Sequence, residues 1–168
     1  ACKTFIVHAR NAWLQGLSPK ENREIPPLKY EYVYQLKRDF PDLEIILNGG
    51  VTDNEQVAEH LQYVDGVMVG RSAYHQPLTM MGEWDARFYG DAHAAMTLGQ
   101  LVPVLQAYAE KQIQSGKGTQ LRHMARHYLG LSHGMGGARQ WRRTLSDAKL
   151  LADSDAGLLA QAAQSLGL

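Results

Sequence analysis

The first half of the chain contains three short apolar runs, and each ends abruptly in polar or glycine residues. The runs and their endings are Thr4–Val7 before His8-Ala9-Arg10, Glu44–Leu47 before Asn48-Gly49-Gly50, and Gly66–Val69 before Gly70-Arg71. Each run is too short for a helix and too continuously apolar for a strand with one exposed face. This pattern predicts three parallel strands that are covered on both faces.

The segments between these runs have the periodicity of amphipathic helices. Apolar residues recur at intervals of three and four within residues 33–40 and 57–64, and Pro41 ends the first of these helices. Thr52–Glu55 has the sequence of a capping box at the start of the second helix. The resulting order of strands and helices predicts a parallel sheet with right-handed crossovers.

From about residue 94 the helical period continues to the end of the chain. Helices are expected near residues 98–113, 121–129, 139–143 and 156–166. Pro103 is expected to delay or kink the first of them, and the short connections favour a bundle. The expected fold class is therefore α/β over residues 1–93, followed by an all-α part over residues 94–168.

Polar residues at the strand ends form the candidate binding site, because ligands of parallel sheets meet the carboxyl ends of the strands. Glycines there allow backbone N–H groups to approach a phosphate, and an arginine adds a guanidinium. Two simpler interpretations remain: a plain turn at the glycine pair, and a histidine that only packs. The candidate ligand-binding residues are His8, Arg10, Asn48, Gly49, Gly50, Gly70 and Arg71.

Residues 11–29 form a long segment without regular periodicity. A loop of this length in a compact domain is usually functional or disordered. Its prolines are expected to stiffen it, and apolar residues are expected to anchor it over the carboxyl face; these are Trp13, Leu14, Leu17, Ile25 and Leu28. Lys20 and Arg23 would then face an anionic substrate, unless the loop is a solvated lid without contacts.

The formal net charge of zero conceals an uneven distribution. Residues 1–40 carry +3, residues 41–95 carry −7, residues 117–149 carry +6, and residues 150–168 carry −2. A strongly basic segment beside an acidic one indicates a polyanionic partner. A solvated helix face is the alternative interpretation.

Several classes of protein are disfavoured. Cys2 is the single cysteine, which excludes an internal disulfide framework and a multi-cysteine zinc site. No apolar run approaches the roughly 20 residues of a membrane span, and no signal peptide follows Ala1, so a cytoplasmic protein is expected. His123 and His127 are four residues apart, but Met124 replaces the glutamate of a zinc helix, and no metal site is expected.

Four segments together resemble the tRNA-dihydrouridine synthases, and in particular their A subfamily. They are FIVHARNAWL with GLSPKENREIPPL (residues 5–28), Asn48-Gly49-Gly50, DGVMVGR (residues 65–71) and GARQWRR (residues 137–143). The match covers nearly the whole chain. Asn11 and Gly136 depart from the family pattern, where lysine and proline are expected.

The resemblance implies a TIM barrel with FMN at its mouth, followed by a helical domain. Such enzymes use NADPH to reduce uridine to dihydrouridine at positions 20 and 20a of the tRNA D-loop. By resemblance His8 contacts the flavin, while Asn48, Gly49, Gly50, Gly70 and Arg71 hold its phosphate. The residues expected to contact tRNA are Lys20, Arg23, Arg139 and Arg142.

The three strands would be the last three βα units of an eight-stranded barrel, which usually needs about 250 residues. The resemblance also implies a cysteine that protonates the uracil ring. This catalytic cysteine is expected upstream, because Cys2 precedes the first strand at the opposite, amino end. No residue of this chain is expected to be catalytic, the chain alone is expected to be inactive, and the full-length enzyme is expected to be a monomer. Two alternatives are a non-catalytic tRNA- or RNA-binding helical module and another phosphate-binding barrel enzyme with a different cofactor.

Overall fold

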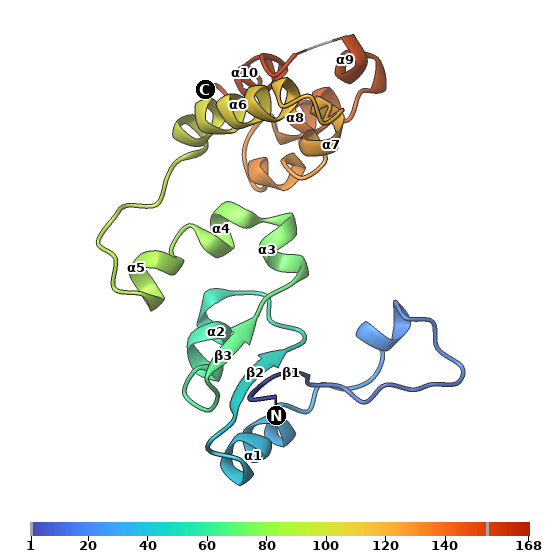
Figure 1. Ribbon diagram of the computed structural model, residues 1–168, viewed down its shortest axis with the longest axis vertical. Helices are drawn as coiled ribbons and strands as arrows, with labels where there is room; N and C mark the ends of the chain where they lie inside the picture. Colours follow the sequence, from blue (N-terminus) through green and yellow to red (C-terminus); the bar gives the residue numbers. More distant parts are fainter. Residues whose placement is uncertain (1, 154) are drawn as a thin grey trace. The chain divides into compact units, whose positions relative to one another are not determined.

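The computed structural model describes residues 2–153 and 155–168, and it divides into two compact units (Figure 1). The first unit comprises residues 2–72 and the second residues 73–168. This division lies earlier in the chain than residue 93/94, where the sequence pattern predicts a domain boundary. The predicted boundary marks the start of continuous helical periodicity and stays a prediction.

The first unit is built on a three-stranded parallel sheet in the order β1-β2-β3. The register pairs Thr4 with Glu44 and His8 with Asn48, and it pairs Asn48 with Met68. The three predicted strands and their parallel order are confirmed. The elements of this unit are β1 (Thr4–His8), η1 (Glu21–Arg23), α1 (Tyr30–Asp39), β2 (Glu44–Asn48), α2 (Asn54–His60) and β3 (Gly66–Met68).

The central strand alone has the burial expected of all three. Ile45 and Leu47 of β2 are completely buried, whereas Phe5 and Ile6 of β1 are 40% and 59% exposed. The prediction of strands covered on both faces is therefore wrong for β1, and also for β3, where Met68 is 46% exposed. The physical reason is that β1 has a single neighbouring strand, β2, among the described residues, so its apolar side chains lack the cover that β2 receives.

Helix α2 begins with a cap that is shifted by one residue from the prediction. Asp53 is the N-cap, and its Oδ1 accepts from the backbone N–H of Gln56 at 2.9 Å. The Gln56 side chain in turn accepts from the backbone N–H of Thr52. Aspartate is at least as good an N-cap as threonine, so Asp53 and Gln56 take the roles that the sequence pattern assigned to Thr52 and Glu55.

The second unit is helical. Four of its helices (α3, α4, α5 and α9) were not predicted from the sequence. The segment predicted as one helix over residues 121–129 is a short helix followed by a 3-10 turn. The elements are α3 (Arg71–His75), α4 (Pro77–Met81), α5 (Trp84–Phe88), α6 (Leu98–Gln114), α7 (Leu121–Ala125), η2 (Leu129–Ser132), α8 (Ala138–Thr144), α9 (Ala148–Asp153) and α10 (Leu158–Gln164).

Helix α6 begins earlier than Pro103 suggested. Thr97 caps it, and the reciprocal bonds between Thr97 and Gln100 complete a capping box. Pro103 lies inside the helix, which continues to Gln114. The expectation of a delayed start is therefore wrong, because the capping box satisfies the first-turn donors upstream of the proline.

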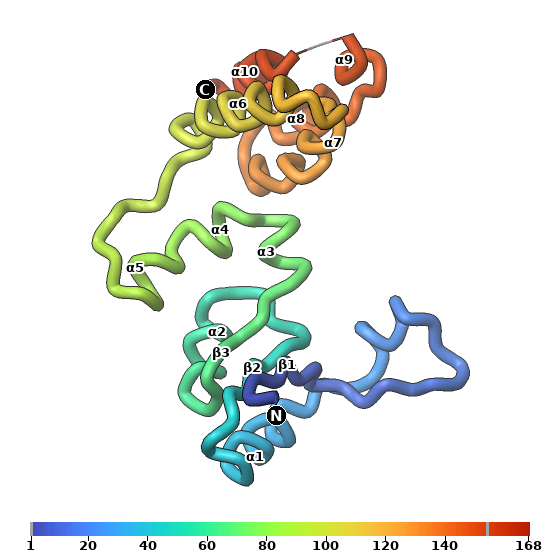
Figure 2. The backbone as a smooth tube through the Cα atoms, in the orientation of Figure 1, coloured from blue at the N-terminus to red at the C-terminus, as the bar shows by residue number. Residues whose placement is uncertain are grey.

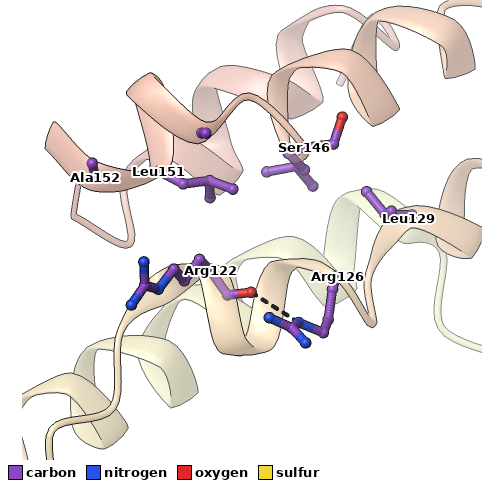
Figure 3. A pocket seen from close by; sticks show the side chains of 8 residues that line it. Arg122, Arg126, Leu129, Ser146, Leu151 and Ala152 are labelled. Carbon is purple, nitrogen blue, oxygen red and sulfur yellow. Dashed lines mark hydrogen bonds between the residues drawn. The ribbon is translucent and has the colours of Figure 1, made fainter.

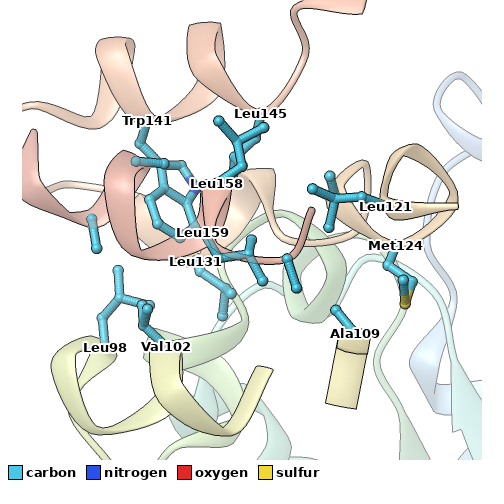
Figure 4. Close-up of a cluster of buried hydrophobic side chains, with 14 residues drawn as sticks. Leu98, Val102, Ala109, Leu121, Met124, Leu131, Trp141, Leu145, Leu158 and Leu159 are labelled. Carbon is cyan, nitrogen blue, oxygen red and sulfur yellow. The ribbon is translucent and has the colours of Figure 1, made fainter. Parts of the chain in front are cut away.

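The core of the second unit surrounds Trp141, which is completely buried (Figure 4). Its indole N–H donates to the carbonyl of Tyr128 at 3.0 Å, so the one polar atom of the ring is satisfied. Leu145, Leu159 and Ala156 are also 0–1% exposed in this cluster. α10 packs against both α6 and α8, which closes the helical unit around the indole.

Two features of the described residues bear on function. No helix among them is long and apolar enough to cross a bilayer. No group of three or more histidine, cysteine, aspartate or glutamate side chains in that part of the chain could hold a metal ion. His123 accepts from the backbone N–H of Gln120, and His127 pairs with the hydroxyl of Tyr74, so the two histidines have separate partners.

Candidate functional site at the carboxyl edge of the sheet

Asn48 joins the carboxyl ends of all three strands. Its Oδ1 lies 2.7 Å from Nδ1 of His8, and its Nδ2 donates to the carbonyl of Met68 at 3.3 Å. The parallel register places these residues side by side at the ends of β1, β2 and β3. With Nδ1 donating to Asn48, Nε2 is the ring atom of His8 that remains for a ligand.

The turn after β2 requires its two glycines. Gly49 and Gly50 have φ angles of +120° and +74°, which other residues rarely adopt. A Cβ on Gly50 would lie 2.5 Å from Leu28 and 2.9 Å from the hydroxyl of Tyr30. That hydroxyl donates to the carbonyl of Gly49 at 2.9 Å. The turn is therefore packed closely from one side by α1 and the end of the loop.

The end of β3 is open by contrast. A Cβ on Gly70 would meet no atom within 4 Å. Among the hydrogen bonds of the described residues, none uses the backbone N–H of Gly49, Gly50 or Gly70. Backbone donors without partners next to open space are what a phosphate group requires.

Arg71 contacts the long loop. Its Nη1 lies 2.8 Å from Oε1 of Glu24, and both side chains are about half exposed. An exposed pair of this kind contributes about 0–1 kcal/mol, so the guanidinium can exchange the carboxylate for a phosphate at small cost. Glu24 is a site residue that the sequence analysis missed, because a contact across 47 positions has no periodic signal.

Arg10 lies at the base of the same loop. Its guanidinium donates to the carbonyls of Glu24, at 3.2 Å, and of Pro26. The backbone reinforces this closure through the bridge between Arg10 and Leu28 and the bond from Lys29 N–H to the Ala9 carbonyl. Arg10 therefore holds the two ends of the loop together, a contact that the sequence pattern did not indicate.

Figure 2 shows the loop of residues 11–29 extending away from the sheet of the first unit. Polar bonds organise the middle of this loop. Asn22 accepts from Trp13 N–H at 2.7 Å and donates to the Trp13 carbonyl at 3.0 Å. Trp13 and Leu14 are 47% and 93% exposed, so the expected apolar anchoring by these two side chains is wrong. Asn22 closes the loop by pairing with the backbone.

Lys20 and Arg23 flank Asn22 on this segment. Lys20 is the N-cap of η1 and Arg23 its last residue, and both are exposed. The short η1 turn therefore presents two cations next to each other on the solvent side of the loop.

Arg139 and Arg142 are exposed on α8, within the basic segment of the second unit. Asp147 is the one acid among residues 117–149, and its Oδ1 accepts from the backbone N–H groups of Lys149 and Leu150. No ion pair in the described part of the chain involves the cations of this segment, which are Lys117, Arg122, Arg126, Arg139, Arg142, Arg143 and Lys149.

The parallel sheet with its polar carboxyl edge makes the first unit an α/β protein of the kind that binds ligands at its strand ends. The family model described as dihydrouridine synthase (Dus) matches residues 1–166. The chain belongs to the dihydrouridine synthase family, and the resemblance inferred from its motifs is confirmed.

Curated relatives support this assignment. A protein of Shewanella oneidensis named tRNA-dihydrouridine(20/20a) synthase is 53% identical over 146 residues, which cover 87% of this chain and 43% of the relative. Proteins of the same name from Salmonella typhi and Synechocystis are 49% and 48% identical over 161 and 164 residues, covering 96% and 98% of this chain and 48% of each relative. The chain thus spans about half the length of the curated relatives that it matches.

Proposed function

We propose that this chain supplies the last three βα units and the helical domain of a flavin-dependent tRNA-dihydrouridine synthase. The enzyme would use NADPH to reduce uridines 20 and 20a of the tRNA D-loop, as a cytoplasmic monomer. The observation that carries this proposal is the gathering of three polar strand ends at one sheet edge in a member of the dihydrouridine synthase family. Residues 1–93 would be barrel and residues 94–168 the helical tRNA-binding domain.

The strand ends fit the phosphate end of FMN. The partnerless N–H groups of Gly49, Gly50 and Gly70 supply donors, and the open space beside Gly70 supplies room. Asn48 would hold the ribityl side, and Arg71 would turn from Glu24 to the phosphate. When bound and reduced by NADPH, FMN would supply the hydride that reduces the uracil ring.

His8 would orient the flavin through its remaining ring nitrogen. Asn48 fixes the imidazole by accepting from Nδ1, so Nε2 faces the ligand in a defined orientation. Cys2 would not be the proton donor, because it precedes β1 at the amino end, and its thiol donates to the carbonyl of Thr4. The proton donor would therefore come from a part of the protein outside these 168 residues, and the chain alone would be inactive.

Recognition of tRNA would rest on phosphate contacts. A target base must leave its stack to reach a flavin, so affinity must come mainly from the backbone. Lys20 and Arg23 on the loop and Arg139 and Arg142 on α8 are exposed cations suited to that role.

The test uses the longest protein that is produced from the gene encoding this chain. It measures whether that protein retains flavin on purification. We expect the purified protein to be yellow and to form dihydrouridine in unmodified tRNA with NADPH, as measured by nucleoside mass spectrometry. Arg71→Gln should weaken FMN binding about 10- to 150-fold, since one charge-assisted phosphate contact is worth about 1.5–3 kcal/mol. Arg38→Gln is the matched control on α1, and it should not change the affinity for FMN. A colourless protein that gains no flavin absorbance on FMN addition would refute the proposal.

A second candidate function is RNA binding without catalysis, favoured by the unpaired cations of residues 117–149. It predicts salt-sensitive binding of tRNA by a protein that neither retains flavin nor reduces uridine.

A further inference from the structure

A cavity of about 320 Å³ lies inside the second unit, between α7 and the segment from the end of α8 to α9 (Figure 3). Arg122 and Arg126 form one wall. Leu151 and Ala152 of α9 form the opposite wall, with Ser146 and Leu129 at its ends. α7 and α9 pack against each other, so the two walls belong to one compact body.

The charged wall has no ion-pair partner among the described residues. Neither Arg122 nor Arg126 takes part in an ion pair among residues 2–153 and 155–168. Nε of Arg126 donates to the carbonyl of Arg122 at 3.3 Å (Figure 3), which directs the side chain along the helix. No bond of the described chain uses the Nη atoms of either arginine, so both forks are available to an anion.

The opposite wall is apolar. Leu151 is partly buried, Ala152 carries a single methyl, and Leu145 beneath them is 1% exposed. The hydroxyl of Ser146 already donates to the carbonyl of Arg142 at 2.7 Å. Free phosphate has no apolar surface, so it could contact the two arginines but would leave the apolar wall without a contact.

A cationic wall that faces an apolar wall matches a nucleotide, which has an anionic phosphate and a flat apolar base face. The volume is near the lower end of small-molecule pockets, about 300–1,000 Å³, and suits one nucleotide rather than a dinucleotide cofactor.

We propose that this cavity is a nucleotide subsite that takes one unpaired nucleotide of the bound tRNA. Arg122 and Arg126 hold its phosphate, and the base lies against Leu151 and Ala152. The subsite is separate from the flavin edge of the first unit, and its role is to fix the register of the tRNA. The inference rests on the proposed tRNA function.

The test is equilibrium binding of an unmodified tRNA transcript to the 168-residue chain, measured by fluorescence at several salt concentrations. Ala152→Leu adds aliphatic bulk to the cavity without changing charge. It should weaken binding at least about fivefold, because a displaced base loses its apolar contact with this wall, and should leave the salt slope unchanged. Arg126→Gln should weaken binding and reduce the salt slope by about one.

Matched controls separate the cavity from the general basic surface. Ala160→Leu on α10 adds the same bulk at an exposed alanine elsewhere, and it should not change affinity. If Ala152→Leu lowers the melting temperature, Ala148→Leu fills the same cavity from the start of α9.

Two results would overturn the inference and are distinguishable. If folded variants with a filled cavity bind tRNA as tightly as the wild-type chain, the subsite is wrong while the proposed tRNA function stands. If the wild-type chain does not bind tRNA at low salt, the proposed function and the subsite both fail.

Discussion

Nδ1 of His8 lies 2.7 Å from Oδ1 of Asn48, two residues that are 40 positions apart and directly opposite each other in the parallel register. The amide of Asn48 also reaches the carbonyl of Met68 on the third strand. One side chain therefore ties together the ends of three strands. The same contact orients the imidazole that we propose to face the flavin.

Asn48→Ala should destabilise the first unit by about 1–2 kcal/mol, because it removes two partly exposed hydrogen bonds of about 0.5–1.5 kcal/mol each. Urea unfolding monitored by circular dichroism measures this change. Asn48→Asp is the informative comparison, because the carboxylate can accept from His8 but cannot donate to Met68. Equal stability of Asn48→Ala and the wild type would show that the three strand ends hold together without the amide.

The strand ends could be predicted because their signal is local. The runs around Ile6, Ile46 and Val67 are continuous apolar segments, and parallel order follows from the helical segments between them. Parallel order then places His8, Asn48 and Met68 at one edge. The sequence therefore predicts those site residues that lie directly at the ends of consecutive strands.

The polar closure of the loop could not be predicted. The contacts from Arg10 to the Glu24 and Pro26 carbonyls and from Arg71 to the Glu24 carboxylate join positions that follow no hydrophobic period. The cap of α2 was misplaced by one residue because Thr52 and Asp53 are both good N-caps. Where adjacent residues have similar propensities, tertiary geometry decides.

His60 should make the stability of the first unit depend on pH. Its ring is 4% exposed, Nδ1 lies 2.7 Å from the Tyr34 hydroxyl, and burial lowers the pKa of His60 below its ordinary value, an effect that the Glu59 charge partly opposes. The unfolded chain therefore binds a proton near pH 6.5 while the folded chain does not. The contribution of His60 to the free energy of unfolding is fully present above that pH. As the pH decreases toward the folded pKa, stability falls by at most about 1.4 kcal/mol per pH unit.

Urea unfolding at pH 7.5 and pH 5.5 measures this dependence. His60→Gln is the control, because it removes the titrating group while all other histidines remain. The loss of stability on acidification should be smaller in His60→Gln than in the wild type. An identical loss in both proteins would assign the pH dependence to other groups.

Gly137 should tolerate no side chain, unlike its neighbour Gly136. Gly137 has a φ of +80° at the N-cap of α8, and a Cβ there would overlap the carbonyl oxygen of Ser165. Gly137→Ala should therefore destabilise the second unit by about 2–4 kcal/mol, through backbone strain and displacement of the segment after α10.

Gly136 has open space and no positive φ, so Gly136→Ala should change stability by less than about 1 kcal/mol. Thermal unfolding of both variants tests the pair, and similar melting temperatures would contradict the prediction.

Removal of the Asn22 amide should open the loop without unfolding the sheet. The two bonds between Asn22 and the Trp13 backbone close residues 13–22, and the trypsin sites Lys20 and Arg23 flank Asn22. Asn22→Ala removes both bonds, at a cost of about 1–3 kcal/mol to the local closed state. When loop opening is faster than cleavage, the cleavage rate follows the population of the open form. Limited trypsin digestion should therefore be about fivefold faster or more in Asn22→Ala.

Asn11→Ala, at an exposed position before the closed segment, should be cleaved at the wild-type rate. The urea midpoint of the sheet should stay unchanged, because Arg10 still holds the ends of the loop. Equal cleavage rates for the Asn22→Ala and Asn11→Ala variants would show that Asn22 does not close the loop.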